Sequence, residues 1–441
     1  MNRMSRSTLV FLIGAVLVFG VTQALFSLEI LTSFWSTIIR TGAVMAIVSI
    51  GLNLIYGFNG QFSLGQWGFY AIGAYTAADI TWRWANNKSA DGLVVMLLVT
   101  GLSGTAIMFL RAKLARIRGL DALSAFTLYL TAMILLAVLS VFLGGFITPA
   151  VSGLLQALPT ALSMQIVFFL AVLIAGLIAA EISFIFGLPV LTLGSDYFGI
   201  ATLGFSIIVK VLLDNSDTMF GFVEMKGARG MVGIPRLTSW FWVFLFLFVV
   251  VVVTRNLLRS SYGRAIISIR EDEIAAKAMG IDVAHYKNLT FVIGSLFAGL
   301  AGALYAHING FLSPNTFNFI RSFDPMIIIV FGGLGSITGT LAASFTWALV
   351  LEGFLRLWLP EGFETWRYVV YPILLLLLML LKPKGLFGDY EIPFLRDQLP
   401  PLEPIAPERI EEGIPPAAIQ ASATTMPVKP SDNPTSQEAS E

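Results

Sequence analysis

Long apolar runs recur along almost the whole chain, and most have the length that an α-helix needs to cross a bilayer, about 20 residues. Charged residues make up only 12% of the 441 residues, against about 25% in an ordinary soluble domain. So few charges cannot cover a surface exposed to water. The sequence therefore predicts an all-α polytopic membrane protein, with apolar spans at 8–28, 37–57, 92–110, 124–146, 164–186, 189–213, 238–258, 288–309 and 368–382.

Two glycine-rich stretches depart from this simple pattern. The stretch 60–80 is short for a span, and the stretch 325–355 is long but interrupted at Gly332, Gly333 and Gly335. Each is compatible with a full span, a broken helix, or a re-entrant segment, which is tolerated at membrane depth only where protein surrounds it. We therefore expect about nine to eleven transmembrane helices, some of them broken or re-entrant.

The composition excludes several classes of function. Without cysteine the chain forms no disulfide, zinc–thiolate site or iron–sulfur cluster, and His285 and His307 alone do not suggest a metal site. Basic and acidic residues balance at 27 each, so no positive field attracts nucleic acid. No GxxxxGK[ST] phosphate loop is present, and we expect no ATP hydrolysis, cofactor, metal or catalytic residue in this chain. Carboxylates near membrane depth lack the spacing of a proton relay: Asp79, Glu181, Asp196, Asp324 and Glu352.

Positive charge in short loops predicts the orientation of the spans. Basic residues cluster at 111–118, 255–270 and 382–384, and such clusters mark the cytoplasmic side. The first apolar run has no convincing cleavage site, so we expect an uncleaved first span rather than a signal peptide. We divide the chain into a transmembrane domain, 1–388, and a cytoplasmic tail, 389–441. The tail is rich in proline and poor in aromatic residues, which predicts disorder.

The segment 51–75 combines closely spaced glycines with amide and hydroxyl side chains. Small residues let helices pack closely, and polar side chains between helices stabilise such packing. The same polar groups also suit the lining of a solute pathway, where a membrane helix unwinds. Both interpretations are open at this point, and Asn53, Gln61 and Ser63 are candidate pathway residues.

A second segment of this kind lies at 191–205. It suits an unwound helix that exposes backbone groups to the ammonium or carboxylate of a substrate. It equally suits a kinked helix that begins after Pro189. Ser195 and Asp196 join the candidate pathway residues on the first interpretation.

The sharpest feature is a short polar segment between two apolar spans. Glu271, Asp272 and Glu273 suit the first turn of a short helix, where the helix dipole favours anions. Alanines give this helix a narrow face, Gly280 suits the position after its last turn, and Asp282 suits the cap of the next helix. A short, small-sided helix on the positive side is shaped to insert into a groove of another protein. An ordinary amphipathic surface helix is the alternative.

These segments occur in an order that resembles a known family, the branched-chain amino acid permeases of bacterial ABC importers, and within it the LivM-like branch. The resemblance covers roughly 37–80 and 187–388. It rests on GQFSLG at 60–65, SDYFGIATLGF at 195–205, GRA at 263–265, IREDEIAA at 269–276, FVIGSLFAGLAGALYA at 291–306, GGLGSI at 332–337 and KPKGLFG at 382–388. The ordered succession is far more specific than any one of these pieces.

The resemblance implies a permease subunit in the bacterial inner membrane that translocates branched-chain or other neutral amino acids. It implies four kinds of partner: a homologous second permease, two ATP-binding cassette subunits, a periplasmic substrate-binding protein and the amino-acid substrate. ATP hydrolysis then takes place in the partner subunits. Importers of urea or short amides in the same family are the first alternative.

The resemblance also identifies the short polar helix as the coupling helix that docks into an ATP-binding subunit. The implied docking residues are Glu271, Glu273, Ala275, Ala276 and Gly280. The general importer motif has a glutamate directly before the two alanines, whereas this chain has Ile274 there. This departure leaves docking plausible and puts the acidic contact in doubt.

The region 85–165 is longer than the family usually has at this point, and it adds about two spans whose function the sequence does not indicate. A secondary transporter or channel is the rival from a different class. Such a protein needs no ATPase, and its short polar helix would have no groove to enter. A membrane-embedded enzyme is the third alternative, disfavoured because no acid–base or metal cluster is present.

Overall fold

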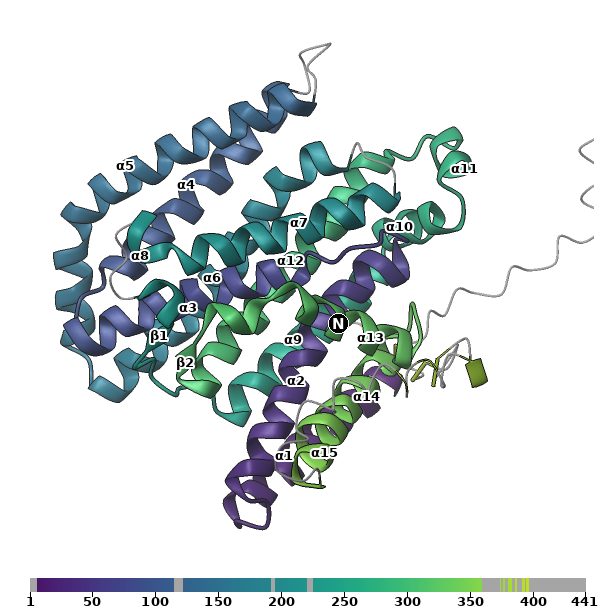
Figure 1. Cartoon of the computed structure of the whole chain (residues 1–441), viewed down its shortest axis with the longest axis horizontal. Helices are drawn as coiled ribbons and strands as arrows, with labels where there is room; N and C mark the ends of the chain where they lie inside the picture. Colours follow the sequence, from purple (N-terminus) through teal and green to yellow (C-terminus); the bar gives the residue numbers. More distant parts are fainter. Residues whose placement is uncertain are drawn as a thin grey trace, which may run out of the picture. The chain divides into compact units, whose positions relative to one another are not determined.

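The computed structural model describes residues 6–114, 122–191, 195–219 and 225–358, together with scattered positions between 373 and 395. Most of the described chain is helical (Figure 1). The long helices are α1 (Arg6–Ser27), α2 (Ser33–Asn53), α3 (Gln66–Asn87), α4 (Asp91–Leu114), α5 (Ala122–Gln156), α6 (Thr160–Val190), α7 (Ser195–Asp214), α9 (Trp240–Arg259) and α12 (Val283–Asn309).

Shorter elements connect these helices. The short α-helices are α8 (Ser216–Met219), α10 (Ser261–Glu271), α11 (Glu273–Ala278), α13 (Phe323–Gly332), α14 (Ile337–Trp347) and α15 (Leu355–Trp358). The π-helices are η1 (Leu54–Phe58) and η5 (Ala348–Phe354), and the 3₁₀-helices are η2 (Gly227–Arg229), η3 (Pro314–Phe317) and η4 (Phe319–Ser322). The strands β1 (Met231–Val232) and β2 (Phe311–Leu312) pair antiparallel. In Figure 1, α10 and α11 lie at one end of the bundle, and β1 and β2 lie at the other.

Nine segments of the described chain are long and apolar enough to cross a membrane: Val10–Ser27, Ser33–Phe58, Asp91–Leu110, Leu123–Gln156, Thr160–Val190, Tyr197–Asp214, Trp240–Arg259, Val283–Asn309 and Ile337–Phe354. The predicted polytopic all-α fold is confirmed. The stretch 60–80 contributes α3, whose 22 residues make a helix about 33 Å long. The predicted span 368–382 and part of the basic cluster 111–118 lie outside the described residues.

The boundary between α6 and α7 differs from the sequence prediction. Pro189 does not precede the start of a helix, because α6 continues through it to Val190. The following Leu191 N–H still donates to the Gly187 carbonyl at 2.9 Å. A proline in the last turn removes only one helical donor, so the helix tolerates it there. The expected span 189–213 therefore begins later, at Ser195.

The centre of the bundle is formed by α2, α3, α6 and α12, which approach one another through glycines. A Cβ atom on Gly51 would lie 2.6 Å from the carbonyl oxygen of Gly294 in α12. A Cβ atom on Gly73 would overlap the backbone of Gly299. Backbones this close leave no room for a side chain, so these glycines serve helix packing.

Residues 85–165 contain the end of α3 and the helices α4 and α5, which pack against each other and against α6 (Figure 1). An ion-pair network joins the α3 end to the α4 start. Arg83 contacts Asp79 at 3.0 Å and Asp91 at 2.9 Å. The region 85–165, for which the sequence indicates no function, therefore contains a pair of packed helices, α4 and α5. The ion pairs of Arg83 attach the start of α4 to the end of α3.

The stretch 325–355 contains a helical hairpin with a glycine turn. Gly333 and Gly335 both have positive φ angles, +116° and +82°, which favour glycine. The first arm, α13, has ten residues and is about 15 Å long. That is half of a hydrocarbon core about 30 Å thick. The chain runs from β2 at one end of the bundle to a turn beside Arg270 at the other, and the second arm, Ile337–Phe354, is long enough to span the membrane. The structure therefore supports the broken-helix interpretation of this stretch.

Four residues of the predicted tail pack against the bundle: Glu391, Ile392, Phe394 and Leu395, here called the C-terminal clasp. Glu391 Oε1 accepts a hydrogen bond from the Ile337 N–H at 2.5 Å, and its Oε2 accepts one from the Thr338 hydroxyl at 2.6 Å. A carboxylate at this place satisfies donors at the N-terminus of α14, which helix geometry leaves without partners.

Phe394 joins the clasp to two further helices. Its ring stacks on Phe11 of α1 with centroids 3.8 Å apart, and the Arg255 guanidinium lies 3.9 Å from the ring centre. Its carbonyl accepts hydrogen bonds from Arg255 and Arg259 of α9 at 2.9 and 2.7 Å. The clasp therefore belongs to the same compact unit as the bundle, Met1–Arg396. The rest of the tail, 397–441, lies outside the described residues.

Candidate functional site

The chain unwinds after α2, within the polar segment 51–75. The helix first widens into η1 and then ends, so that the chain from Asn59 to Gly65 is not helical. Gly60 has a φ of +75°, and its N–H donates to the Tyr56 carbonyl at 3.0 Å. Glycine adopts this conformation at little cost, whereas other residues resist it. The break is thus placed by Gly60, inside one of the segments that the sequence singled out.

Asn53 forms hydrogen bonds with the glycine turn and with α14. Its amide nitrogen donates to the Ser336 carbonyl at 3.0 Å and to the Thr340 hydroxyl at 2.9 Å. Its amide oxygen accepts the Gly335 N–H at 2.9 Å. Asn53 therefore holds the glycine turn between α13 and α14 against α2. The hydrogen bonds favour the packing interpretation over pathway lining at this position.

Gln61 and Ser63 lie in the unwound stretch and are both buried. Asn59 donates from its amide nitrogen to the Gln61 amide oxygen and to the Thr290 hydroxyl, both at 2.9 Å. The Ser63 hydroxyl accepts the Gly65 N–H at 3.3 Å. These bonds fix the unwound chain against α12. Of the two predicted residues, Gln61 also lines a pocket.

Ser195 and Asp196 are the first residues of α7, and their side chains lie outside the described residues. The start of α7 does contact the unwound stretch, because the Thr202 hydroxyl accepts the Leu64 N–H at 3.0 Å. Phe198 lines the same pocket as Gln61. The structure thus brings the two polar segments together, and a pathway role for Ser195 and Asp196 stays a prediction.

Asp272 separates α10 from α11 and caps the second helix. Its carboxylate oxygen Oδ1 accepts the N–H groups of Ile274 and Ala275, both at 2.9 Å. This placement differs from the sequence prediction, which put Glu271 in the first turn of the short helix. Glu271 instead ends α10, because Asp272 adopts an extended conformation that interrupts the helix. Only Glu273 stands in the first turn of α11.

The C-terminal end of α11 follows the prediction. Gly280 has a φ of +84°, and its N–H donates to the Lys277 carbonyl at 3.1 Å. The next N–H, of Ile281, donates to the Ala276 carbonyl at 3.1 Å. These two bonds are those of a Schellman motif, which ends a helix at a glycine. Asp282 then caps α12, as predicted. Both ends of α11 are thus closed, which makes it a well-defined rigid unit.

The exposed surface of α11 is not the one that the motif suggested. The side chain of Ala276 is only 4% exposed and faces the chain itself, whereas Ala275 is exposed. Ile274 and Met279 are 82% and 84% exposed. Apolar side chains this exposed at the end of a bundle favour a protein contact. The sequence reasoning missed both, because it treated Ile274 only as a departure from the motif.

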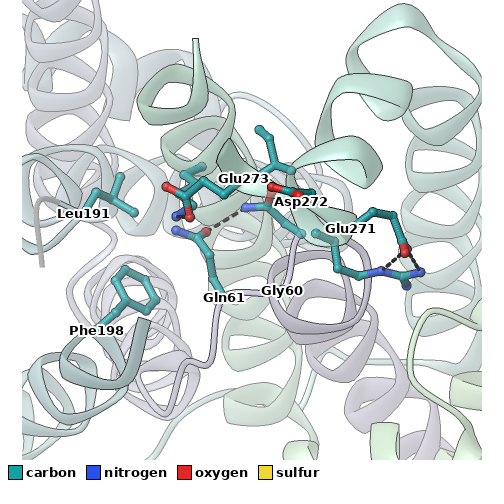
Figure 2. A pocket seen from close by; sticks show the side chains of 11 residues that line it. Gly60, Gln61, Leu191, Phe198, Glu271, Asp272 and Glu273 are labelled. Atoms are coloured by element: carbon teal, nitrogen blue, oxygen red, sulfur yellow. Dashed lines mark hydrogen bonds and ion pairs between the residues drawn. The ribbon is translucent and has the colours of Figure 1, made fainter. Parts of the chain in front are cut away.

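A polar pocket of about 210 Å³ lies between α11 and the unwound stretch (Figure 2). Its lining residues are Asn59, Gly60, Gln61, Leu191, Phe198, Ile269, Arg270, Glu271, Asp272, Glu273 and Lys287. In Figure 2 the side chains of Gln61 and Glu273 meet in the pocket, and Glu271 lies to one side. All three segments that the sequence singled out contribute to this pocket.

Two basic side chains bind α11 and α10 to the bundle. Lys287 of α12 pairs with Glu273 at 2.6 Å. Arg270 pairs with Glu271 at 2.5 Å and donates from Nη1 to the carbonyl of Gly57 at 2.8 Å. The hydrogen bond from Arg270 therefore joins α10 to η1, the π-helix that follows α2. These contacts of Lys287 and Arg270 join the exposed helix α11 and the adjoining α10 to the bundle. Neither basic residue was a predicted site residue, although Arg270 lies beside the predicted acidic group.

Comparison with known proteins gives a consistent result. A family model described as the permease component of the branched-chain amino acid transport system matches residues 34–163 and 117–379. The high-affinity branched-chain amino acid transport system permease protein LivM of Escherichia coli (strain K12) is 32% identical over 255 residues, covering 51% of this chain and 57% of that protein. The probable LivM of Methanocaldococcus jannaschii is 26% identical over 241 residues, covering 51% of this chain and 70% of that protein.

The permease protein LivH of Escherichia coli (strain K12) is 31% identical over 133 residues, covering 30% of this chain and 42% of that protein. The chain thus matches little more than half the length of the Escherichia coli LivM protein. No solved structure matches the chain. The relatives, named as permease proteins, and the nine apolar segments of the described chain agree in indicating a multi-pass membrane protein. Since the family model extends over residues 34–379, the chain belongs to the branched-chain amino acid transport permease family.

Proposed function

We propose that the chain is the permease subunit of an ABC importer that translocates branched-chain or other neutral amino acids across the inner membrane. The observation that carries this proposal is α11, a short helix closed at both ends that presents Ile274 and Met279 at the end of the bundle. Two relatives of this chain, LivM and LivH, are named as permease proteins of branched-chain amino acid transport.

The contacts of α11 support a coupling role. We place it in a groove of an ATP-binding cassette subunit, one of two such partners. Movement of the groove would displace α11 and α10 together, and Arg270 would carry the displacement to η1 through Gly57. Glycine-lined contacts such as that of Gly51 with Gly294 allow helices to shift without side chains colliding. Coupling of this kind requires that the partner bind two permease states with different affinity.

A homologous second permease and a periplasmic substrate-binding protein complete the proposed assembly. The second permease supplies the other half of a central path, and the binding protein delivers the amino acid. Hydrolysis of ATP takes place in the partner subunits. The present chain supplies the path and the coupling contact.

The proposal is tested by uptake of labelled leucine, isoleucine and valine into vesicles that contain this chain and its three kinds of protein partner: the second permease, the ATP-binding subunits and the binding protein. Uptake should require ATP and every component. In Ile274→Glu and Met279→Glu, uptake should fall strongly, because a charge replaces an apolar contact in the groove. Val232→Glu, an exposed change at the opposite end of the bundle, serves as the matched control and should transport normally.

Two outcomes would overturn this function. Downhill solute movement through the chain alone, without ATP, would indicate a channel or secondary carrier. Preference for urea or short amides over leucine would indicate a related importer with another substrate. Normal uptake in both α11 variants would remove the coupling role of α11 while leaving the transport class intact.

A further inference from the structure

An ion pair joins the segment before the glycine turn to the first arm of the hairpin. Arg321 in η4 donates from Nη1 to Asp324 Oδ2 in α13 at 3.3 Å. The hairpin turn lies near the end of the bundle that carries α10, because a Cβ atom on Gly335 would lie 3.1 Å from Arg270 Nη1. The arm between turn and pair spans about 15 Å, half of the hydrocarbon core. The pair therefore lies near the middle of the membrane.

Both partners of this pair reach the surface of the chain. The Arg321 side chain is 28% exposed and that of Asp324 is 14% exposed. Charged groups that face hydrocarbon are costly, and membrane proteins turn them toward water-filled cavities or toward other protein. This face is therefore covered by a water-filled path or by another subunit rather than by lipid. Phe319, Ile320 and Phe323 are exposed beside it and give the face an apolar rim.

The geometry of the pair suits exchange with a ligand. Charge-assisted hydrogen bonds between arginine and carboxylate are ordinarily about 2.7–2.9 Å long. At 3.3 Å, the contact between Arg321 Nη1 and Asp324 Oδ2 is longer than that. A free α-amino acid carries one carboxylate and one ammonium, both attached to its α-carbon. Inserting it would give each protein charge a new opposite partner and leave the net charge of the site unchanged.

A rigid aromatic layer supports this segment from behind. The Phe317 ring lies 6.0 Å from that of Tyr70 and 6.5 Å from that of Tyr305. Trp67 donates from its indole nitrogen to the Thr316 carbonyl at 3.1 Å, which holds η3 against α3. Arg321 lies within electrostatic range of Tyr70 and Tyr305. A recognition pair needs such support, since a loosely held site loses its geometry.

We propose that Arg321 and Asp324 receive the carboxylate and the ammonium of the amino acid halfway along its path. This inference rests on the proposed function and extends it by naming the residues that touch the substrate. The apolar rim of Phe319, Ile320 and Phe323 then takes the hydrocarbon side chain. The pair replaces Asn53 in the pathway role, since Asn53 bonds to the glycine turn.

The test uses the complete reconstituted importer and four variants. Arg321→Gln and Asp324→Asn should each lower leucine uptake at least about tenfold, because each variant removes one opposite charge from the bound substrate. ATP hydrolysis stimulated by the loaded binding protein should stay within about twofold of wild type, because the coupling contact is untouched. Lys210→Gln, which breaks an ion pair on α7, is the matched control and should leave uptake unchanged.

The fourth variant, the charge reversal R321D/D324R, separates recognition from structure. A purely structural ion pair tolerates reversal, so recovered uptake would overturn the proposal. Continued loss of uptake, with an unchanged melting temperature of the complex, would support it. If wild type imports leucine while Arg321→Gln and Asp324→Asn import it equally well, only this inference fails. If wild type imports no amino acid with all partners present, the proposed function itself fails.

Discussion

Arg270 donates a hydrogen bond to the carbonyl of Gly57, a residue 213 positions earlier in the chain, at 2.8 Å. The donor lies in the last turn of α10, next to the exposed helix α11, and the acceptor lies in η1, the π-helix that follows α2. A π-helix is a strained wide turn that often marks a functional position. The bond is therefore a direct link between the proposed docking surface and the centre of the bundle.

Replacing Arg270 with glutamine should uncouple ATP hydrolysis in the partner subunits from transport through this chain. Gln cannot reach the Gly57 carbonyl, so movement of α11 would no longer reach η1. We expect about a tenfold loss of uptake for each ATP hydrolysed, as measured in reconstituted vesicles. Arg264→Gln, an exposed arginine on the same helix, is the control and should keep the wild-type ratio. An unchanged ratio in the Arg270 variant would contradict the link.

Asn53→Leu should destabilise the fold rather than change the substrate. The variant removes three hydrogen bonds and leaves the Gly335 N–H without its partner. An orphaned buried donor costs about 1–3 kcal/mol. The melting temperature of the purified chain should fall by several degrees, whereas Thr37→Val, which loses one exposed hydrogen bond, should melt as wild type. If Asn53→Leu keeps its melting temperature but changes substrate preference, Asn53 lines the pathway after all.

Glycines at close helix contacts should respond very differently from glycines that face open space. A Cβ atom on Gly73 would overlap Gly299, so Gly73→Ala should cost about 1–3 kcal/mol of overpacking. Gly101 in α4 has no atom within 4 Å of the added Cβ position, so Gly101→Ala should be neutral or stabilising by up to about 1 kcal/mol. Thermal unfolding of the two variants side by side measures the difference, and equal melting temperatures would refute it.

The C-terminal clasp gives a prediction about truncation. A chain ending at Arg396 keeps every clasp contact and should melt and transport as the full chain does. A chain ending at Gly388 loses the Glu391 cap of α14 and the Phe394 contacts, and its melting temperature should fall. Glu391→Gln isolates the cap, and we expect it to reproduce part of that loss. Equal stability of both truncated chains would show that the clasp contributes nothing.

Much of the fold was predictable because local rules decide it. Apolar length marks the spans, and Asp272 and Gly280 close a short helix through bonds to residues only a few positions away. In each case the physical cause lies within one or two helical turns of the residue concerned.

The remainder depends on partners that lie far away in the sequence. Asn53 finds its hydrogen-bond acceptor 283 positions later, and no local pattern distinguishes that role from pathway lining. Pro189 was expected to precede a helix because proline favours first turns, but α6 is long enough to absorb it near its end. The ordered part of the tail was missed because the average composition from 389 onward conceals the apolar residues Ile392, Phe394 and Leu395.

The cap that Glu391 places on α14 also orders events during biosynthesis. Its acceptor atoms are synthesised 54 positions after the Ile337 N–H that they bind. Until those residues leave the ribosome, the N-terminus of α14 lacks the carboxylate that caps it. The last described residues of the chain therefore complete a helix made much earlier. A product that terminates before Glu391 therefore keeps uncapped N–H groups at the start of α14.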